Sequence, residues 1–312
     1  MSSAVPTPDR QDLMKDARSL PTPPAIVMQI VQLLSDENVS MDDIAASVSL
    51  DAALAGKVLR TVNSAAFSPA ARVTRLDRAI SFLGIGPFRS LLMGTAMSDL
   101  VPASGTAVAS EIRRRSVINA TLSKAFAEEV DVKISEEAFL GGLLGSLGHL
   151  VLARKVPETH ELLCQQGGGW STAPDEFALL GYTMDDLTAD LLEQWGMPDM
   201  IPESIMLRSE ARIDWTPRRA TGDLVTALRL GLMAERVLCN EDSASALADL
   251  LTLGRNVLGL NLLRVSEILV ATEPLVADLA RSMKFDVPEN THESILEGAL
   301  ETLEQRYTQS QT

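Results

Sequence analysis

The sequence predicts an all-α fold, and three observations support this prediction. Apolar residues recur at helical steps of three and four, as in Ile26, Ile30, Leu33 and Leu34. Alternating strand patterns are nearly absent, in agreement with an aromatic content of only 4%. At several places a hydroxyl residue stands three positions before an aspartate, where it can cap a helix while the acid meets the positive helix end. These pairs are Ser40 with Asp43, Thr74 with Asp77, Thr172 with Asp175, and Thr183 with Asp186.

Proline and glycine breaks divide the predicted helices into blocks. Residues 1–12 form a polar, proline-containing segment that we expect to be a disordered tail. The segment 101–105 separates a first block of short helices from a longer helix that we expect to begin near Ala107. Three consecutive glycines at 167–169 predict that a helix stops and a flexible turn follows.

Composition indicates a soluble, cytoplasmic protein. The 312 residues carry 27 basic and 42 acidic side chains, and the net charge of −15 opposes the phosphate backbone of nucleic acids. The N-terminus lacks the basic start and apolar stretch of a signal peptide. No run reaches the ~18 continuous apolar residues that a membrane helix requires. We therefore expect neither a nucleic-acid partner nor a membrane partner.

The histidines and cysteines do not form a metal-binding pattern. His149, His160 and His292 are too few and too scattered for most multi-histidine sites. His149 lies among apolar residues and is expected to be a packing residue, whereas His292 is expected in a surface segment. Cys164 and Cys239 lack the C-x-x-C spacing and are expected to be small buried apolar residues.

Two other motifs have structural explanations. Arg113–Arg115 is the densest basic cluster, but consecutive helical residues point about 100° apart and cannot form one patch. We therefore expect a solvated or partly salt-bridged helix face rather than a phosphate site. In the segment 141–148, leucine and glycine alternate inside a predicted helix, which favours close packing of helices.

A set of short motifs follows in one order along the first two thirds of the chain. They are Leu20-Pro-Thr-Pro-Pro24, Ser40-Met-Asp-Asp-Ile44, Asp51-Ala-Ala-Leu54, Leu59-Arg-Thr-Val-Asn-Ser-Ala-Ala-Phe67, Val73, Ile80-Ser-Phe-Leu-Gly84, Ala138-Phe-Leu-Gly-Gly-Leu-Leu144 and Leu192-Glu-Gln-Trp-Gly-Met-Pro198. Together they make roughly residues 13–212 resemble the HDOD family, the HD-related output domains of bacterial signalling proteins. The resemblance implies an N-terminal subdomain of short helices (13–104) packed on an HD-like helical bundle (105–212). Residues 213–312 then form a C-terminal helical region.

The resemblance also implies where a related HD phosphohydrolase would hold its metal ions. The first ligand histidine falls near Arg115, the His-Asp pair falls on Gly145 and Ser146, a further histidine falls on Met184, and later histidines fall around Arg208. The last aspartate of that pattern falls near Leu228. Glycine has no donor atom, and the fixed charge of arginine repels a metal ion. We therefore expect a degenerate, non-catalytic pocket that needs no cofactor.

What remains of the implied function is recognition. The resemblance implies a regulatory protein of signal transduction that contacts a signalling protein partner. Asn63, Ser64 and Phe67 belong to a family-typical turn that is a candidate partner surface, although Asn and Ser also satisfy backbone groups in tight turns. Two alternatives stay open. The degenerate pocket could bind a nucleotide, such as a cyclic dinucleotide, through Arg115, or the chain could retain a metal-dependent phosphohydrolase activity.

Overall fold

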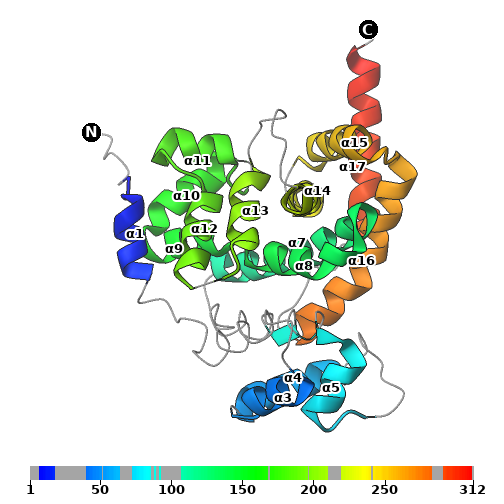
Figure 1. Ribbon diagram of the computed structural model, residues 1–312. Coiled ribbons are helices and arrows are strands. Elements are labelled where there is room, and N and C mark those ends of the chain that lie inside the picture. Colours follow the sequence, from blue (N-terminus) through cyan, green and yellow to red (C-terminus); the bar gives the residue numbers. More distant parts are fainter. Residues whose placement is uncertain are drawn as a thin grey trace.

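A computed structural model describes most of the chain. The described residues are 7–17, 40–50, 52–63, 72–85, 88, 91–92, 107–167, 169–195, 197–209, 219–239, 242–282 and 291–310. Every regular element within these ranges is a helix, which confirms the predicted all-α fold. A block of short helices, a bundle and a C-terminal helical region follow one another along the chain (Figure 1).

By their position in the sequence, the helices can be described in three groups. The N-terminal group contains α1 (Arg10–Ala17), α3 (Met41–Ser49), α4 (Ala52–Val62) and α5 (Leu76–Leu83). The bundle contains α7 (Ala107–Val130), the 3-10 helix η1 (Val132–Ile134), α8 (Ser135–Leu144), α9 (Leu147–Lys155), α10 (Pro157–Gln166), α11 (Ala173–Leu180), α12 (Met184–Gln194) and α13 (Met200–Arg208). The C-terminal group contains α14 (Arg219–Cys239), α15 (Ser243–Leu258), α16 (Leu262–Ser282) and α17 (His292–Ser310).

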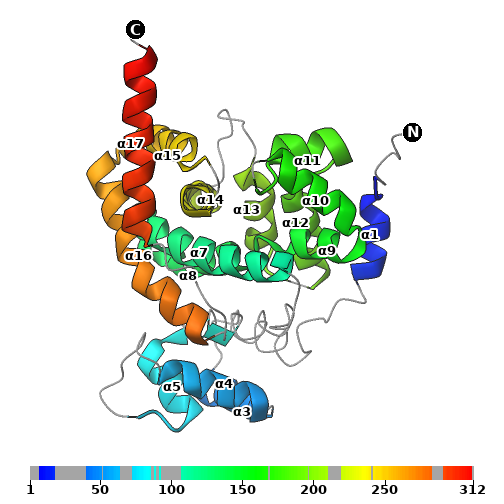
Figure 2. The same ribbon diagram turned by 180° about the vertical axis from the view of Figure 1, so that it is seen from behind.

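Helices α3, α4 and α5 cluster at one end of the molecule, beside the C-terminal end of α16 (Figures 1 and 2). Ser40 caps α3 as predicted, because its hydroxyl accepts the backbone N–H of Asp43 at 3.1 Å. The predicted Thr74 cap of α5 is wrong, since that helix begins one residue later with Arg75 at the N-cap position. The guanidinium of Arg75 binds the carboxylate of Asp77 at 2.9 Å.

The expected disordered tail differs from the structure for residues 10–12, which belong to α1. This helix packs on the bundle because Leu13 is buried and Arg10 forms an ion pair with Asp190 of α12. The hydroxyl of Tyr182 also donates to the carbonyl oxygen of Pro8 at 3.0 Å. Residues 1–6 of the expected tail lie outside the described residues.

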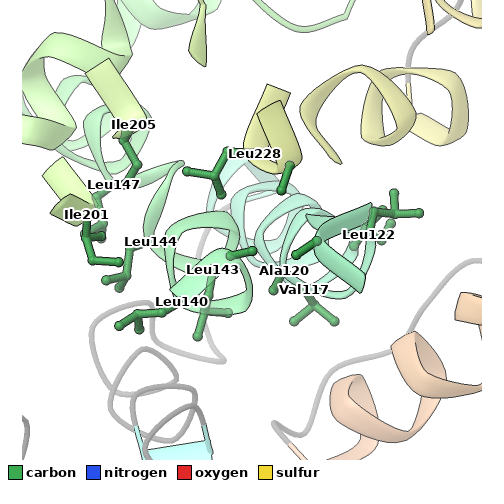
Figure 3. Close-up of a cluster of buried hydrophobic side chains, with 14 of the residues drawn as sticks. Val117, Ala120, Leu122, Leu140, Leu143, Leu144, Leu147, Ile201, Ile205 and Leu228 are labelled. Carbon is green, nitrogen blue, oxygen red and sulfur yellow. The ribbon is translucent and has the colours of Figure 1, made fainter. Parts of the chain in front are cut away.

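The core of the bundle contains apolar side chains of α7, α8, α9, α13 and α14 (Figure 3), and the glycines of α8 let these helices approach one another. A Cβ added to Gly142 would lie 2.7 Å from the Cα atom of Ala120, and one added to Gly141 would lie 2.9 Å from the side chain of Leu228. The glycines therefore let α7 and α14 approach α8 closely, as the leucine–glycine alternation predicts. The close approach buries the cluster of branched side chains in Figure 3.

Helix α14 belongs physically to the bundle, although it lies in the C-terminal part of the sequence. It runs between α13 and α15 (Figure 1), and Leu224, Leu228 and Leu230 on it are 0% exposed. The outer helices α15, α16 and α17 pack around it on the far side from α11 (Figures 1 and 2). No single described helix is long and apolar enough to cross a membrane; α15 and α16 reach that length and apolarity only as a pair bent by 111°.

His292 lies at the start of α17 and is buried, so its predicted surface position is wrong. Its Nδ1 atom lies 2.7 Å from the carbonyl oxygen of Leu269 on α16. Its backbone N–H donates to the carboxylate of Glu273 at 3.0 Å. The histidine therefore ties α17 to α16.

Candidate functional site

Four of the five predicted pocket residues meet at one small cavity. Gly145 and Ser146 form the turn between α8 and α9, Met184 begins α12, and Arg208 ends α13; all four line this cavity. Arg115 lies just outside it and contacts two lining residues instead. The chain thus brings together positions separated by up to 63 residues between Gly145 and Arg208.

Arg208 fills the space that a side chain at position 145 would need. Its Nη2 and Nε atoms donate to the carboxylate of Asp185 at 2.6 and 3.1 Å, and Nη2 also donates to the carbonyl oxygen of Gly145 at 2.9 Å. A Cβ added to Gly145 would lie 2.2 Å from the Nη1 atom of Arg208. The glycine and the arginine are therefore sterically coupled. Both members of the ion pair are buried.

Arg115 is fixed by carboxylates on two helices. It donates to Glu111 on its own helix and to Glu235 on α14, both at 2.7 Å, and to the carbonyl oxygen of Cys239 at 3.0 Å. Its guanidinium also lies 4.5 Å from the centre of the Trp170 ring, a cation–π contact. The salt-bridged part of the prediction for Arg113–Arg115 is therefore confirmed. The solvated part is wrong, because Arg113 and Arg115 are buried.

Glu176 is a buried carboxylate of the cavity lining that the sequence pattern did not indicate. It is the buried residue of α11, and its carboxylate accepts the backbone N–H of Met184 at 2.7 Å and the hydroxyl of Ser171 at 2.5 Å. Burial raises the pKa of Glu176 to about 7, and the nearby charge of Asp185 adds to this rise against the lowering effect of its hydrogen bonds. The available signal was weak, since an acid in the first turn of a helix is ordinarily exposed.

The bundle also brings two histidines together beside Glu176. The ring of His149 stacks on Trp170 at 4.3 Å between centroids and meets His160 edge-on at 5.5 Å. Its Nε2 atom lies 3.8 Å from the carboxylate of Glu176. Burial lowers the pKa of His149 well below its ordinary value and lowers that of His160 to about 4. Both imidazoles are therefore neutral at pH 7, and the ring of His149 packs against Trp170 inside the bundle, in agreement with its apolar sequence surroundings.

The side chains around the cavity do not fit the metal ions that the HD resemblance implies. No three histidine, cysteine, aspartate or glutamate side chains in the described ranges converge as a metal-binding group. The oxygens of Asp185 accept hydrogen bonds from Arg208, and those of Glu176 accept them from Ser171 and Met184. A buried guanidinium also opposes a metal cation at this position.

The candidate partner turn is described at one of its three residues. The amide nitrogen of Asn63 donates to the carbonyl oxygens of Leu59 and Val73, at 2.6 and 2.7 Å, and its amide oxygen accepts the N–H of Val73. Asn63 thus ties the end of α4 to the segment before α5, which is the structural role that asparagine has in turns. Ser64 and Phe67 lie outside the described residues.

Comparison with known protein families identifies the family to which this helical fold belongs. The profile of the HDOD domain matches residues 20–211, well over half of the chain. The chain belongs to the HDOD family. The match includes the bundle helices that surround the cavity but ends before α14, which supplies Glu235.

Solved structures share the HDOD fold of this chain. An HDOD domain protein of unknown function from Geobacter sulfurreducens has a TM-score of 0.66 at 20% identity, covering 89% of this chain and 99% of its own. A candidate phosphohydrolase from Shewanella amazonensis has a TM-score of 0.68 at 20% identity, covering 87% and 97%. At such identities the likeness shows the fold alone. A candidate signal transduction protein from Marinobacter aquaeolei has a TM-score of 0.62 at 25% identity, covering 95% of this chain and 62% of its own.

A curated relative is longer than the matched region. An uncharacterized protein from Treponema pallidum is 23% identical over 194 residues, which are 60% of this chain and 37% of that protein. The matched region thus spans little more than a third of that relative.

Proposed function

We propose that this HDOD protein is a non-catalytic regulator of signal transduction that acts by binding a signalling protein partner. The observation that carries this proposal is the buried ion pair of Arg208 and Asp185, seated in the space left by Gly145. A protein that uses a metal at this position needs donor atoms there, and this chain has a guanidinium instead. The similarity to the Marinobacter signal transduction protein supports the regulatory part of the proposal.

The state of the other polar groups supports a non-catalytic role. A hydrolase needs a base or a metal that activates water within reach of the substrate. Asp185 lies 2.6 Å from Arg208 and Glu176 lies 3.8 Å from His149, and both carboxylates already accept hydrogen bonds from the protein. These hydrogen bonds connect α11 to α12 through Glu176, and α12 to α13 through Asp185. The residual phosphohydrolase alternative therefore has little support from the geometry.

The alternative that the pocket binds a nucleotide through Arg115 has little support from the geometry. Arg115 was the expected phosphate ligand, but Glu111, Glu235 and the carbonyl oxygen of Cys239 take its donors. Releasing Arg115 would leave Glu235 as an unpaired buried charge, which is strongly unfavourable. A nucleotide bound by Arg115 would have to offset that cost.

Two measurements test the proposal. The full chain, tagged and expressed in its native cells, should capture a signalling protein that then forms a stoichiometric complex with the purified chain. In parallel, the purified chain with Mn²⁺ should hydrolyse bis-p-nitrophenyl phosphate no faster than its Asp185→Asn variant. Metal-dependent turnover that is lost in Asp185→Asn would contradict the non-catalytic assignment. Failure of every captured protein to bind the purified chain directly would contradict the partner assignment.

A further inference from the structure

The cavity beneath α11 is closed on most sides and very small. Its volume is about 30 Å³. It lies between the α8–α9 turn, the α10–α11 loop, α12, α13 and α14. The polar side chains lining it are Asn119, Ser146, His149, Ser171, Glu176, Asp185, Arg208, Ser209, Glu235 and Arg236.

Polar groups at this cavity lack partners, although their neighbours are well paired. The Nη1 atom of Arg208 and the Nδ1 atom of His149 are buried and make no hydrogen bond in the described part of the chain. These side chains are only 3% and 8% exposed. Buried polar atoms without partners are uncommon and call for a ligand or ordered water. Both side chains that carry these unpartnered atoms line the cavity, which makes it the candidate site for such a ligand.

Arg236 adds an uncompensated charge to the same cavity. It lines the wall from α14, and within the described residues it forms no hydrogen bond or ion pair. Its charge nevertheless reaches Glu176 and His149, since it lowers the pKa of both. Arg208 is different, because its charge is matched by Asp185. Among the described residues, Arg236 thus supplies a positive charge at the cavity that no hydrogen bond or ion pair takes up.

We propose that this cavity binds a small tetrahedral oxyanion through Arg236, the free Nη1 atom of Arg208 and His149. Guanidinium groups present several N–H donors in a fixed geometry that matches oxyanions. The available space suits such an ion and is far below the about 300–1,000 Å³ of pockets that enclose organic ligands. The occupant is therefore a free phosphate or the phosphoryl end of a larger molecule whose remainder lies outside the mouth. This inference goes beyond the protein-binding function proposed above.

The proton on Glu176 modulates this site. An ionised Glu176 repels the anion, and the raised pKa of about 7 makes the neutral acid accessible near pH 6. The other titratable or charged groups around it are Arg115 on α7, His149 on α9, His160 on α10, Asp185 on α12, Arg208 on α13, and Glu235 and Arg236 on α14. Binding should therefore be tighter at pH 6 than at pH 8, by up to about tenfold.

Titration calorimetry of the full chain with sodium sulfate tests the proposal, because sulfate keeps its charge between pH 6 and pH 8. At constant ionic strength we expect one saturable site at pH 6. Arg236→Gln should weaken binding by about tenfold, equivalent to ~1.4 kcal/mol. The control Arg255→Gln, at an exposed position on α15, should change the affinity less than about twofold. Circular dichroism would verify that both variants are folded.

The outcomes are distinct. Absence of saturable binding at pH 6, or equal affinities of the wild-type chain and a folded Arg236→Gln variant, would overturn the anion site. If inorganic phosphate and a nucleoside monophosphate bind alike, the site recognises a phosphoryl group on a larger molecule. If only inorganic phosphate binds, the ligand is the free anion. Either of these two results supports the site, and neither depends on whether a protein partner exists.

Discussion

At the scale of single residues, the steric coupling of Gly145 and Arg208 determines how the candidate site is filled. A side chain at position 145 and the guanidinium of Arg208 cannot occupy the same volume, because a Cβ there would lie 2.2 Å from Nη1. The ion pair with Asp185 holds the guanidinium in place. Neither residue can therefore change alone without disturbing a buried charge.

Gly145→Ala should test this coupling directly. The methyl group would displace Arg208 and leave Asp185 as a buried, unpaired carboxylate, so we expect a loss of about 3 kcal/mol in the free energy of unfolding. Gly298→Ala is the matched control, since a Cβ at this position in α17 meets nothing within 4 Å. The control should be more stable than wild type by about 0.5–1 kcal/mol. Urea unfolding measures both, and an unchanged Gly145→Ala would refute the coupling.

At the scale of elements, α11 reverses the usual pattern of a surface helix. Glu176 faces the interior, whereas the neighbouring Phe177 is 62% exposed. The helix is held by the hydrogen bonds of Glu176 to Ser171 and to the start of α12. A glycine with a positive φ of 79° ends it at Gly181.

Alanine substitution of the polar Glu176 should therefore lower the free energy of unfolding more than alanine substitution of the apolar Phe177. Glu176→Ala removes the acceptor for the Met184 N–H and the Ser171 hydroxyl, and we expect a loss of about 2 kcal/mol. Phe177→Ala should change the free energy of unfolding by less than about 0.5 kcal/mol, because the ring is exposed. Parallel urea titrations at pH 7 compare the two. Equal effects would mean that α11 is held by apolar packing instead.

The same contrast explains how far the sequence could predict each element. The Thr183 cap was predictable because both hydrogen bonds of its capping box join residues three apart, and the structure contains both. Glu176 was not predictable, since its partner Met184 lies eight residues away beyond a turn. The pairing of Arg208 with Gly145 depends on the packing of whole helices. Local spacing indicates caps, whereas buried polar contacts between helices require the fold.

At the scale of the whole molecule, buried neutral histidines make stability depend on pH. Burial lowers the pKa of His160 to about 4 and also lowers the pKa of His149 well below its ordinary value. Between pH 6.5 and pH 4 the unfolded chain therefore takes up protons that the folded state does not bind, so acidification lowers stability. Glu176, with its pKa raised to about 7, acts in the opposite direction, because its contribution is lost as pH rises toward 7.

Urea unfolding at pH 4.5, 5.5 and 6.5 should show the net loss on acidification. His160 alone contributes roughly 3 kcal/mol across the full range, the product of its shift and the energy of one pKa unit. His160→Gln should flatten the profile. Glu176→Gln should steepen the acid loss, because it removes the opposing term. A profile that does not differ between wild type and His160→Gln would show that folding does not lower the pKa of His160.

The bundle itself extends beyond the region that the family resemblance covers. Leu228 of α14 packs against Gly141, and Glu235 neutralises Arg115 from the same helix. A chain ending at residue 212 would expose the apolar surfaces of α7 and α8 that α14 covers and leave Arg115 without Glu235. We expect such a truncation to lack a cooperative unfolding transition, whereas the full chain unfolds cooperatively. Denaturation followed by circular dichroism compares them. A cooperative transition in the 1–212 chain would show that the HDOD region folds without α14.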